Sequence, residues 1–226
     1  MTLLGCRRTR VQKLLIYGAS GLGREILDMI EEINSITPQY KIEGWIDDGV
    51  PSGAVINNVT VLGNINYIAT VDSCAVVLAI ADPNIKEQLY NKIKAENTQI
   101  VFPIIVHPSS SVSPLSELDE GVIITRFCWV TANTRIGKCV LLNTRCDVGH
   151  DSRIGNFSSL MPSVNISGNV TTGKKVYIGV QSALLQGLSI GDNAIIGMGS
   201  KVMTNVPPNC TVLGNPAKII QRREKC

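Results

Sequence analysis

The feature that most constrains the fold of this chain is a six-residue repeat that fills its second half. Every sixth residue from Val112 to Val202 is Ile, Leu or Val, with Thr172 as the single exception. The residue four positions after each of these is small or β-branched, except at Leu188. Two coupled periodic positions over about 95 residues, without an insertion, are the signature of a repeat architecture.

The repeat predicts a triangular parallel β-solenoid. Each hexad makes one short strand and one corner, and three hexads close a coil of 18 residues. The aliphatic residue fills the interior, and the small residue allows a tight corner. The low aromatic content, 4% against 44% hydrophobic residues overall, agrees with such a core. Cys128 and Cys146 then stack at one interior position of successive coils, where we interpret them as reduced core residues.

The first half of the chain alternates predicted strands with predicted helices. The strands are residues 14–17, 40–48, 75–80 and 99–105, and the helices are residues 24–33 and 85–96. This alternation indicates a small, Rossmann-like parallel α/β sheet. The predicted domains are 13–106 for this sheet and 107–226 for the solenoid with its C-terminal tail. We expect residues 1–12 to be a disordered basic leader.

Composition argues against several classes of function. The net charge is +3, and basic residues gather at the two chain ends, where charged tails are usually solvated rather than bound to nucleic acid. Seven cysteines, with no C-x-x-C pair, argue against zinc and a disulfide framework and fit a reducing cytoplasm. No apolar run is long enough to span a membrane, and the first residues lack the order of a signal peptide. We therefore expect a cytoplasmic protein that binds no metal, nucleic acid or membrane.

A glycine-rich turn joins the first strand to the first helix. Gly18, Gly21 and Gly23 lie there, where glycines let the backbone approach a phosphate at a helix N-terminus. The spacing G-x-x-G-x-G differs from the dinucleotide fingerprint, so a phosphate site and a close-packed turn without a ligand both fit it. Asp47 and Asp48 close the second strand. Carboxylates there can accept hydrogen bonds from ribose or base, which we favour over a solvated turn.

One of the two histidines, His150, is followed directly by Asp151. His150 is the third residue of the hexad that starts at Val148, so its side chain should point away from the interior. Such a histidine is either solvated or part of a site formed with a neighbouring subunit, and the residue pattern leaves both open. The other histidine, His107, precedes a proline between the two halves, and we interpret it as a junction residue.

Several motifs of the chain resemble one known family. They are YGASGLGREIL, WIDDG, AIAD, IVHPSSSV and the hexads around VGHDSRIG. In this order and spacing, over residues 14 to about 220, they resemble hexapeptide-repeat sugar acyltransferases of the sialic acid O-acetyltransferase type. That family includes bacterial N-acetyltransferases of UDP-4-amino sugars. The resemblance implies a left-handed β-helix that binds acetyl-CoA between subunits of a homotrimer, and an N-terminal domain that binds a sugar nucleotide.

The resemblance also implies roles for individual residues. His150 is the general base, and Asp151 holds and polarises its imidazole. The residues that contact the nucleotide-linked sugar are Ser20, Gly21 and Leu22, with Asp47 and Asp48 at its base. The residues that line the acetyl-CoA site are Ser159, Gly168, Val180 and Met198. The Gly168 N–H is the candidate oxyanion donor. Leu22 and Ser159 replace histidines of many relatives, so these two positions put the acceptor and the affinity for CoA in question.

The expected function is acetyl-CoA-dependent N-acetylation of a nucleotide-linked 4-amino sugar in bacterial surface-glycan biosynthesis. O-acetylation of a sialic acid or another sugar hydroxyl is the near alternative, because the same base would serve either acceptor. A non-catalytic trimeric scaffold or sugar-nucleotide sensor is a third possibility, which the presence of both His150 and Asp151 disfavours. A dinucleotide-dependent reductase is disfavoured by the spacing of the glycines.

Overall fold

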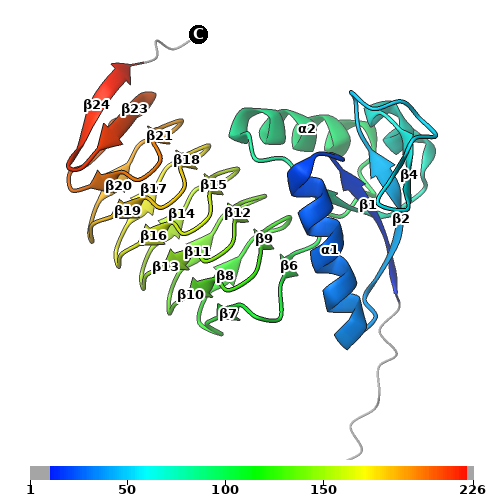
Figure 1. The fold of residues 1–226 in the computed structure, drawn as a ribbon, viewed down its shortest axis with the longest axis horizontal. Coiled ribbons are helices and arrows are strands. Elements are labelled where there is room, and N and C mark those ends of the chain that lie inside the picture. Colours follow the sequence, from blue (N-terminus) through cyan, green and yellow to red (C-terminus); the bar gives the residue numbers. More distant parts are fainter. Residues whose placement is uncertain (1–10, 223–226) are drawn as a thin grey trace, which may run out of the picture.

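The computed structural model describes residues 11–222, an α/β domain followed by a long parallel β-helix (Figure 1). Residues 1–10 of the predicted basic leader lie outside the described residues. The α/β domain contains β1 (Gln12–Tyr17), α1 (Gly21–Ile36), β2 (Tyr40–Ile46), β3 (Val55–Ile56), β4 (Val59–Gly63), a 3-10 helix (Ile65–Thr70), β5 (Ala75–Leu78) and α2 (Pro83–Glu96). Its sheet has the order β3-β4-β2-β1-β5, and β1 is parallel to both of its neighbours.

The central strands of this sheet are buried on both faces. Residues 14–17 of β1 are at most 3% exposed, as expected for an apolar run in a parallel sheet covered by helices. The helix α1 begins directly after Ser20 and buries one apolar face. The helix α2 begins after Asp82, whose side chain accepts hydrogen bonds from the N–H groups of Asn84 and Ile85. Both helices therefore start at the carboxyl edge of the sheet.

The α/β domain differs from the sequence prediction at two places. The predicted strand at residues 99–105 is not a strand of this sheet, because only Val101 bridges to Ala75. Pro103 lacks a backbone N–H and interrupts the ladder. The next strand, β6 (Ile105–Val106), pairs with β9 (Ile123–Ile124) of the second half of the chain instead. The sequence analysis also missed the β3–β4 hairpin, whose strands are antiparallel.

The second half of the chain is a left-handed parallel β-helix with three sheets, which is the predicted fold class. The eight-stranded sheet contains β6 (Ile105–Val106), β9 (Ile123–Ile124), β12 (Leu141–Leu142), β15 (Ser159–Leu160), β18 (Tyr177–Ile178), β21 (Ile195–Ile196), β23 (Cys210–Gly214) and β24 (Ala217–Arg222). The six-stranded sheet contains β7 (Ser111–Val112), β10 (Trp129–Val130), β13 (Asp147–Val148), β16 (Asn165–Ile166), β19 (Ala183–Leu184) and β22 (Lys201–Val202). The five-stranded sheet contains β8 (Glu117–Leu118), β11 (Arg135–Ile136), β14 (Arg153–Ile154), β17 (Thr171–Thr172) and β20 (Ser189–Ile190).

The coils stack in the register that the hexads predict. Val130 pairs with Val148, and Val148 pairs with Ile166, each one coil further on. The aliphatic positions form one continuous hydrophobic core, in which Cys128 and Cys146 are at most 2% exposed. The exception Thr172 is also buried, and its hydroxyl accepts a hydrogen bond from the Gly155 N–H, which satisfies the polar atom inside the coil.

The α/β domain packs against the eight-stranded sheet (Figure 1). A single hydrophobic cluster contains Ile26 of α1 together with Ile123 and Leu141 of the β-helix. At one edge of this contact, Arg126 donates to Asp28 and Glu32 of α1. These contacts join the two domains along the first coils, and α2 reaches further along the sheet.

The junction histidine, His107, takes part in the same ionic contact. It is buried, and its Nε2 lies 2.5 Å from an oxygen of Glu32. Its Nδ1 accepts a hydrogen bond from the Ser109 N–H, so Nε2 carries the proton and donates to Glu32. Hydrogen bonds from Arg126 and then from His107 lower the pKa of Glu32 to about 2.

Candidate active site

The His150–Asp151 pair lies on a corner between the six-stranded and five-stranded sheets. We call this the His150 corner; it comprises residues 149–152 and 167–170. The side chains of His150 and Asp151 are 63% and 45% exposed, so both point away from the interior, as predicted for His150. The His150 Nδ1 lies 2.8 Å from the Asp151 Oδ2, and Asn133 Nδ2 donates to the other oxygen over 3.0 Å. Asp151 is thus held from two sides.

This geometry fixes the roles of the two ring nitrogens. Hydrogen bonds from His150 and then from Asn133 lower the pKa of Asp151, so it is ionised at neutral pH and can only accept. The proton of the neutral imidazole therefore lies on Nδ1, and Nε2 carries the lone pair that can accept a proton. The pair can act as a base with an orienting carboxylate, as in a catalytic triad.

Gly168 lies directly beneath the imidazole, one coil further along the β-helix. A Cβ at this position would lie 2.6 Å from both Nε2 and Cε1 of His150, so any side chain would displace the ring. Among residues 11–222, no acceptor takes a hydrogen bond from the Gly168 N–H. The corner therefore combines a base and a nearby N–H donor.

The other residues predicted for acetyl-CoA lie elsewhere on the β-helix. Val180 and Met198 occupy the corner between the eight-stranded and six-stranded sheets, residues 179–182 and 197–200, which we call the Met198 corner. Met198 is 71% exposed. The six-stranded sheet separates this corner from His150 and Gly168, so a single chain does not bring the four residues together.

Ser159, the remaining residue predicted for acetyl-CoA, faces the α/β domain. It is fully buried, and its hydroxyl accepts a 2.8 Å hydrogen bond from Lys86 Nζ. Lys86 also donates to the Ser158 carbonyl, and burial lowers the pKa of Lys86 to about 7. In this arrangement a ligand reaches the Ser159 hydroxyl only if Lys86 moves, and a contact with acetyl-CoA stays a prediction.

The glycine turn lies at the carboxyl end of β1, next to the end of β5. A Cβ on Gly23 would lie 1.9 Å from the Gly18 carbonyl oxygen, and a Cβ on Gly18 would lie 3.0 Å from the Ala79 oxygen. These two glycines are therefore required by close packing. A Cβ on Gly21 would meet nothing closer than 4.0 Å, which leaves its surface open to a ligand.

The neighbouring residues of the turn lie at the start of α1. Ser20 is exposed and is the N-cap residue, yet its side chain caps no N–H. Leu22 is half-buried and packs against the interdomain hydrophobic cluster. The turn therefore presents Ser20 and Gly21 outward, whereas the aliphatic side chain of Leu22 contributes to domain packing.

The two acidic residues after β2 face this turn. Asp47 accepts hydrogen bonds from the N–H groups of Ala19, Gly49 and Val50. Asp48 is exposed and accepts from the Tyr17 hydroxyl as well as from a backbone N–H. The structure thus brings Asp47 and Asp48 to the same edge as Ser20 and Gly21, where parallel sheets bind ligands.

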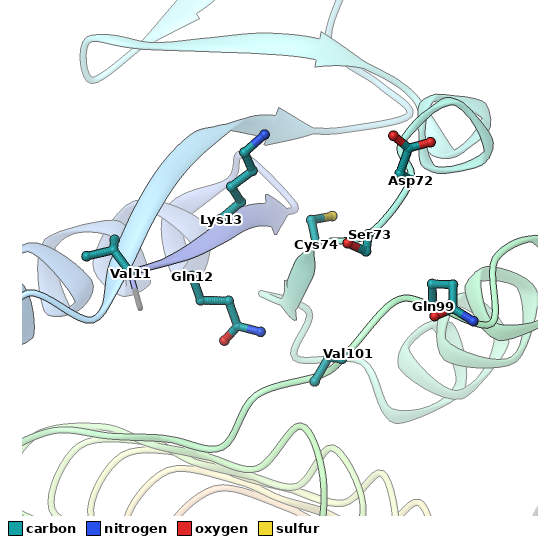
Figure 2. A pocket seen from close by; sticks show the side chains of 8 residues that line it. All are labelled: Val11, Gln12, Lys13, Asp72, Ser73, Cys74, Gln99 and Val101. Atoms are coloured by element: carbon teal, nitrogen blue, oxygen red, sulfur yellow. The ribbon is translucent and has the colours of Figure 1, made fainter. Parts of the chain in front are cut away.

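A hollow of the surface lies away from these residues. A cavity of about 600 Å³ opens at the other end of β1, where Figure 2 shows Lys13, Asp72 and Cys74 around it. Its remaining lining residues are Val11, Gln12, Ser73, Gln99 and Val101. Burial raises the pKa of Cys74 to about 11, so the thiol is protonated and a poor nucleophile. The cavity contains none of the predicted site residues.

Comparison with known proteins decides the family. Residues 13–93 match the family model described as the PglD N-terminal domain. The whole chain is 31% identical to GDP-perosamine N-acetyltransferase of Escherichia coli O157:H7 over 219 residues, covering 92% of this chain and 96% of that protein. The chain belongs to the PglD/NeuD-type family of hexapeptide-repeat sugar acyltransferases.

Solved structures of similar proteins share the complete architecture of this acyltransferase. PerB from Caulobacter crescentus, in complex with CoA and GDP-perosamine, superimposes with a TM-score of 0.85 at 25% identity and covers 94% of this chain and 99% of its own. The acetyltransferase domain of PglB from Neisseria gonorrhoeae FA1090, in complex with acetyl coenzyme A, gives 0.86 at 25% identity over 93% and 100%. The α/β domain and the β-helix are therefore arranged as in these proteins.

The sequence analysis of this acyltransferase missed three residues that hold the site residues in place. Asn133 lies 18 residues before Asp151 and donates to it, so the length of one coil could have identified it. Tyr17, at the end of β1, binds Asp48. Lys86 reaches Ser159 across the domain interface, and no periodicity in the sequence signals that contact.

Other features of the acyltransferase bear on cofactors and membranes. Within residues 11–222, no group of three or more His, Cys, Asp or Glu side chains is arranged to hold a metal ion. None of the helices in that part of the chain has the length and apolar character to cross a membrane.

Proposed function

We propose that this chain transfers the acetyl group of acetyl-CoA to the amino group of a nucleotide-linked 4-amino sugar in bacterial surface-glycan biosynthesis. The observation that carries the proposal is the outward His150–Asp151 pair above Gly168, in a chain 31% identical over 92% of its length to GDP-perosamine N-acetyltransferase. Acetyl-CoA is the co-substrate, and no step of the transfer needs a metal.

His150 is the general base in this proposal. The sugar amine attacks the thioester carbonyl carbon, and a proton passes from the amine to His150 Nε2. Asp151 keeps the other ring nitrogen protonated and stabilises the imidazolium that forms, while Asn133 holds Asp151. The tetrahedral intermediate then collapses, the C–S bond breaks, and the imidazolium returns the proton to the departing CoA thiolate.

The Gly168 N–H is the proposed oxyanion donor. Gly168 lies beside the His150 ring, and its N–H has no acceptor within residues 11–222, so we assign it to stabilise negative charge on the carbonyl oxygen. The outward surface of the glycine turn, at Ser20 and Gly21, receives the nucleotide-linked sugar, with Leu22 at its edge. The positive end of the α1 dipole favours a pyrophosphate there.

The complete site forms between copies of this chain, which we propose to be a homotrimer. His150 and Gly168 lie on one corner, whereas Val180 and Met198 lie on another, so acetyl-CoA contacts both sets only where two copies meet. The exposed Trp129 lies on the intervening six-stranded sheet, the exposed Phe127 lies on the corner just before it, and both fit an interface. We place the trimer in the cytoplasm, where acetyl-CoA is available.

A mixing experiment tests the shared site. The variants His150→Ala and Met198→Arg are each expected to be inactive, and their co-expression should restore a fraction of the activity, because some sites then combine an intact His150 corner with an intact Met198 corner. No restored activity in mixed trimers would contradict a site shared between copies. A monomeric protein that is fully active would contradict the trimer itself.

The proposed reaction is tested by release of the CoA thiol from acetyl-CoA. The acceptors are GDP-perosamine, a UDP-4-amino sugar, and the matching nucleotide sugars with a hydroxyl at the same carbon. Thiol release with an amino sugar and none with its hydroxyl counterpart is expected. Thiol release only with the hydroxyl acceptors would replace N-acetylation by O-acetylation. If none of the acceptors leads to thiol release, the proposal is overturned.

A further inference from the structure

Two adjacent carboxylates at the edge of the α/β sheet have different surroundings. Asp47 is half-buried, and its two oxygens accept three backbone hydrogen bonds from Ala19, Gly49 and Val50, over 2.8–3.1 Å. These bonds tie the glycine turn to the loop after β2. Asp47 is therefore committed to the shape of the turn, and little of its acceptor capacity is left for a ligand.

Asp48, by contrast, is exposed and only partly committed. Its Oδ2 accepts one hydrogen bond from the Tyr17 hydroxyl over 2.6 Å, and its Oδ1 accepts one from the Ile65 N–H over 3.0 Å. Each carboxylate oxygen has two acceptor positions, so one remains on each oxygen. The two donors also fix the orientation of the carboxylate.

Tyr17 is well suited to hold Asp48 in this orientation. It is the last residue of β1 and only 3% exposed, so its ring is locked by packing. Burial, and then the hydrogen bond to Asp48, raise the pKa of Tyr17 far above its ordinary value. The phenol therefore remains a donor at every pH at which the protein would work.

We infer that Tyr17 is a positioning residue that fixes the Asp48 carboxylate as a two-oxygen acceptor for the guanine base of the nucleotide sugar. A carboxylate with one free acceptor position on each oxygen matches two adjacent N–H donors, which guanine presents at N1 and N2. Uracil presents one N–H between two carbonyl oxygens, and these would repel the second carboxylate oxygen. This inference rests on the proposed function, because it assumes that a nucleotide sugar binds at the carboxyl edge of β1 and β2.

Titration of the full-length protein with GDP, inosine diphosphate and UDP tests the inference. Inosine diphosphate lacks only the N2 amino group, so the ratio of its Kd to that of GDP reports the second hydrogen bond. The wild-type protein is expected to bind GDP about tenfold more tightly than inosine diphosphate. In Tyr17→Phe the carboxylate is held from one side only, and the ratio should fall towards one. With the nucleotide sugar, Tyr17→Phe should raise KM and leave kcat unchanged.

Tyr90→Phe is the matched control. Tyr90 is also a mostly buried phenol that donates to a carboxylate, Glu120 Oε1, over 2.5 Å, and neither residue belongs to the proposed site. The same loss of a hydroxyl there should leave the ratio between GDP and inosine diphosphate unchanged. If Tyr90→Phe lowers the ratio as much as Tyr17→Phe, general loosening of the domain explains the effect and the inference is overturned.

The remaining outcomes separate this inference from the proposed function. Equal affinity of the wild type for GDP and inosine diphosphate, or an unchanged ratio in Tyr17→Phe, overturns the inference while thiol release with an amino sugar still supports the reaction. Discrimination that depends on Tyr17, in a protein that releases no thiol with any acceptor, supports the inference and contradicts the proposed reaction. Failure of all three nucleotides to bind also overturns the inference.

Discussion

The imidazole of His150 lies over Gly168, so closely that a Cβ at residue 168 would be 2.6 Å from Nε2. This contact joins two successive coils at the point where the base is proposed to act. Gly168→Ala is expected to push the ring away and to lower kcat about 10- to 100-fold, because small displacements of a catalytic group are costly. The measurement is steady-state thiol release, with the melting temperature recorded alongside. A variant that keeps full activity would show that the position of the ring is not critical.

Asn133 should contribute to the same site through Asp151. Asn133→Ala removes the donor to Asp151 Oδ1 but leaves the 2.8 Å contact between His150 and Asp151. We expect kcat to fall about three- to tenfold, since one of the two bonds that orient the carboxylate is lost. His150→Ala in the same background should then abolish most of the remaining activity. An Asn133→Ala variant with unchanged kcat would assign Asn133 to solenoid stability alone.

The buried amine of Lys86 predicts how stability depends on pH. Its folded pKa is about 7, lowered from 10.5 by burial, so the unfolded chain binds the proton more tightly. The free energy of unfolding should therefore rise with pH between about 7 and 10, by up to about 1.4 kcal/mol per pH unit from this group. Urea unfolding at pH 7 and pH 9 measures the slope.

Lys86→Met should flatten that slope. Lys92→Met is the matched control, because Lys92 lies on the same helix with its side chain 52% exposed. It should keep the slope of the wild type. If Lys86→Met and the wild type gain stability equally between pH 7 and pH 9, Lys86 is not the group that titrates.

The ionic contact between Glu32, Arg126 and His107 at the domain junction predicts a loss of stability at low pH. The pKa of Glu32 is lowered from 4.5 to about 2, so its charge stabilises the folded state fully above pH 4.5, and this stabilisation is lost as the pH falls towards 2. Glu32→Gln should lower the melting temperature at pH 6 by a few degrees, and the difference from the wild type should vanish near pH 2. Because the carboxylate is about half exposed, solvent screening keeps the effect small. A difference that is the same at both pH values would contradict the role of the charge.

The β-helix could be predicted from the sequence because its strands repeat one local rule. The hexads fix which residue points inward, and even the exception Thr172 keeps its place by bonding the Gly155 N–H. The outward position of His150 followed from the same count. The α/β domain was harder, since a proline at residue 103 moved the next strand to the β-helix and the β3–β4 hairpin carries no strong turn signal.

The arrangement of the site could not be predicted in full, because it depends on contacts between residues far apart in the sequence. The bond between Lys86 and Ser159 spans 73 residues and depends on how α2 docks on the eight-stranded sheet. The different surroundings of Asp47 and Asp48 depend on which backbone N–H groups lie within reach, that of Ala19 for Asp47 and that of Ile65 for Asp48. Sequence motifs therefore located these residues but did not distinguish a ligand contact from a structural one.

The most direct test of the account is the pH dependence of kcat/KM for wild type and His150→Ala, measured by thiol release with the preferred amino sugar. We predict that activity of the wild type rises as the imidazole loses its proton, and that His150→Ala lowers kcat/KM about 10²- to 10⁴-fold and removes that ionisation from the profile. A variant that retains wild-type activity within about threefold, with the same pH profile, would contradict the assignment of His150 as the base.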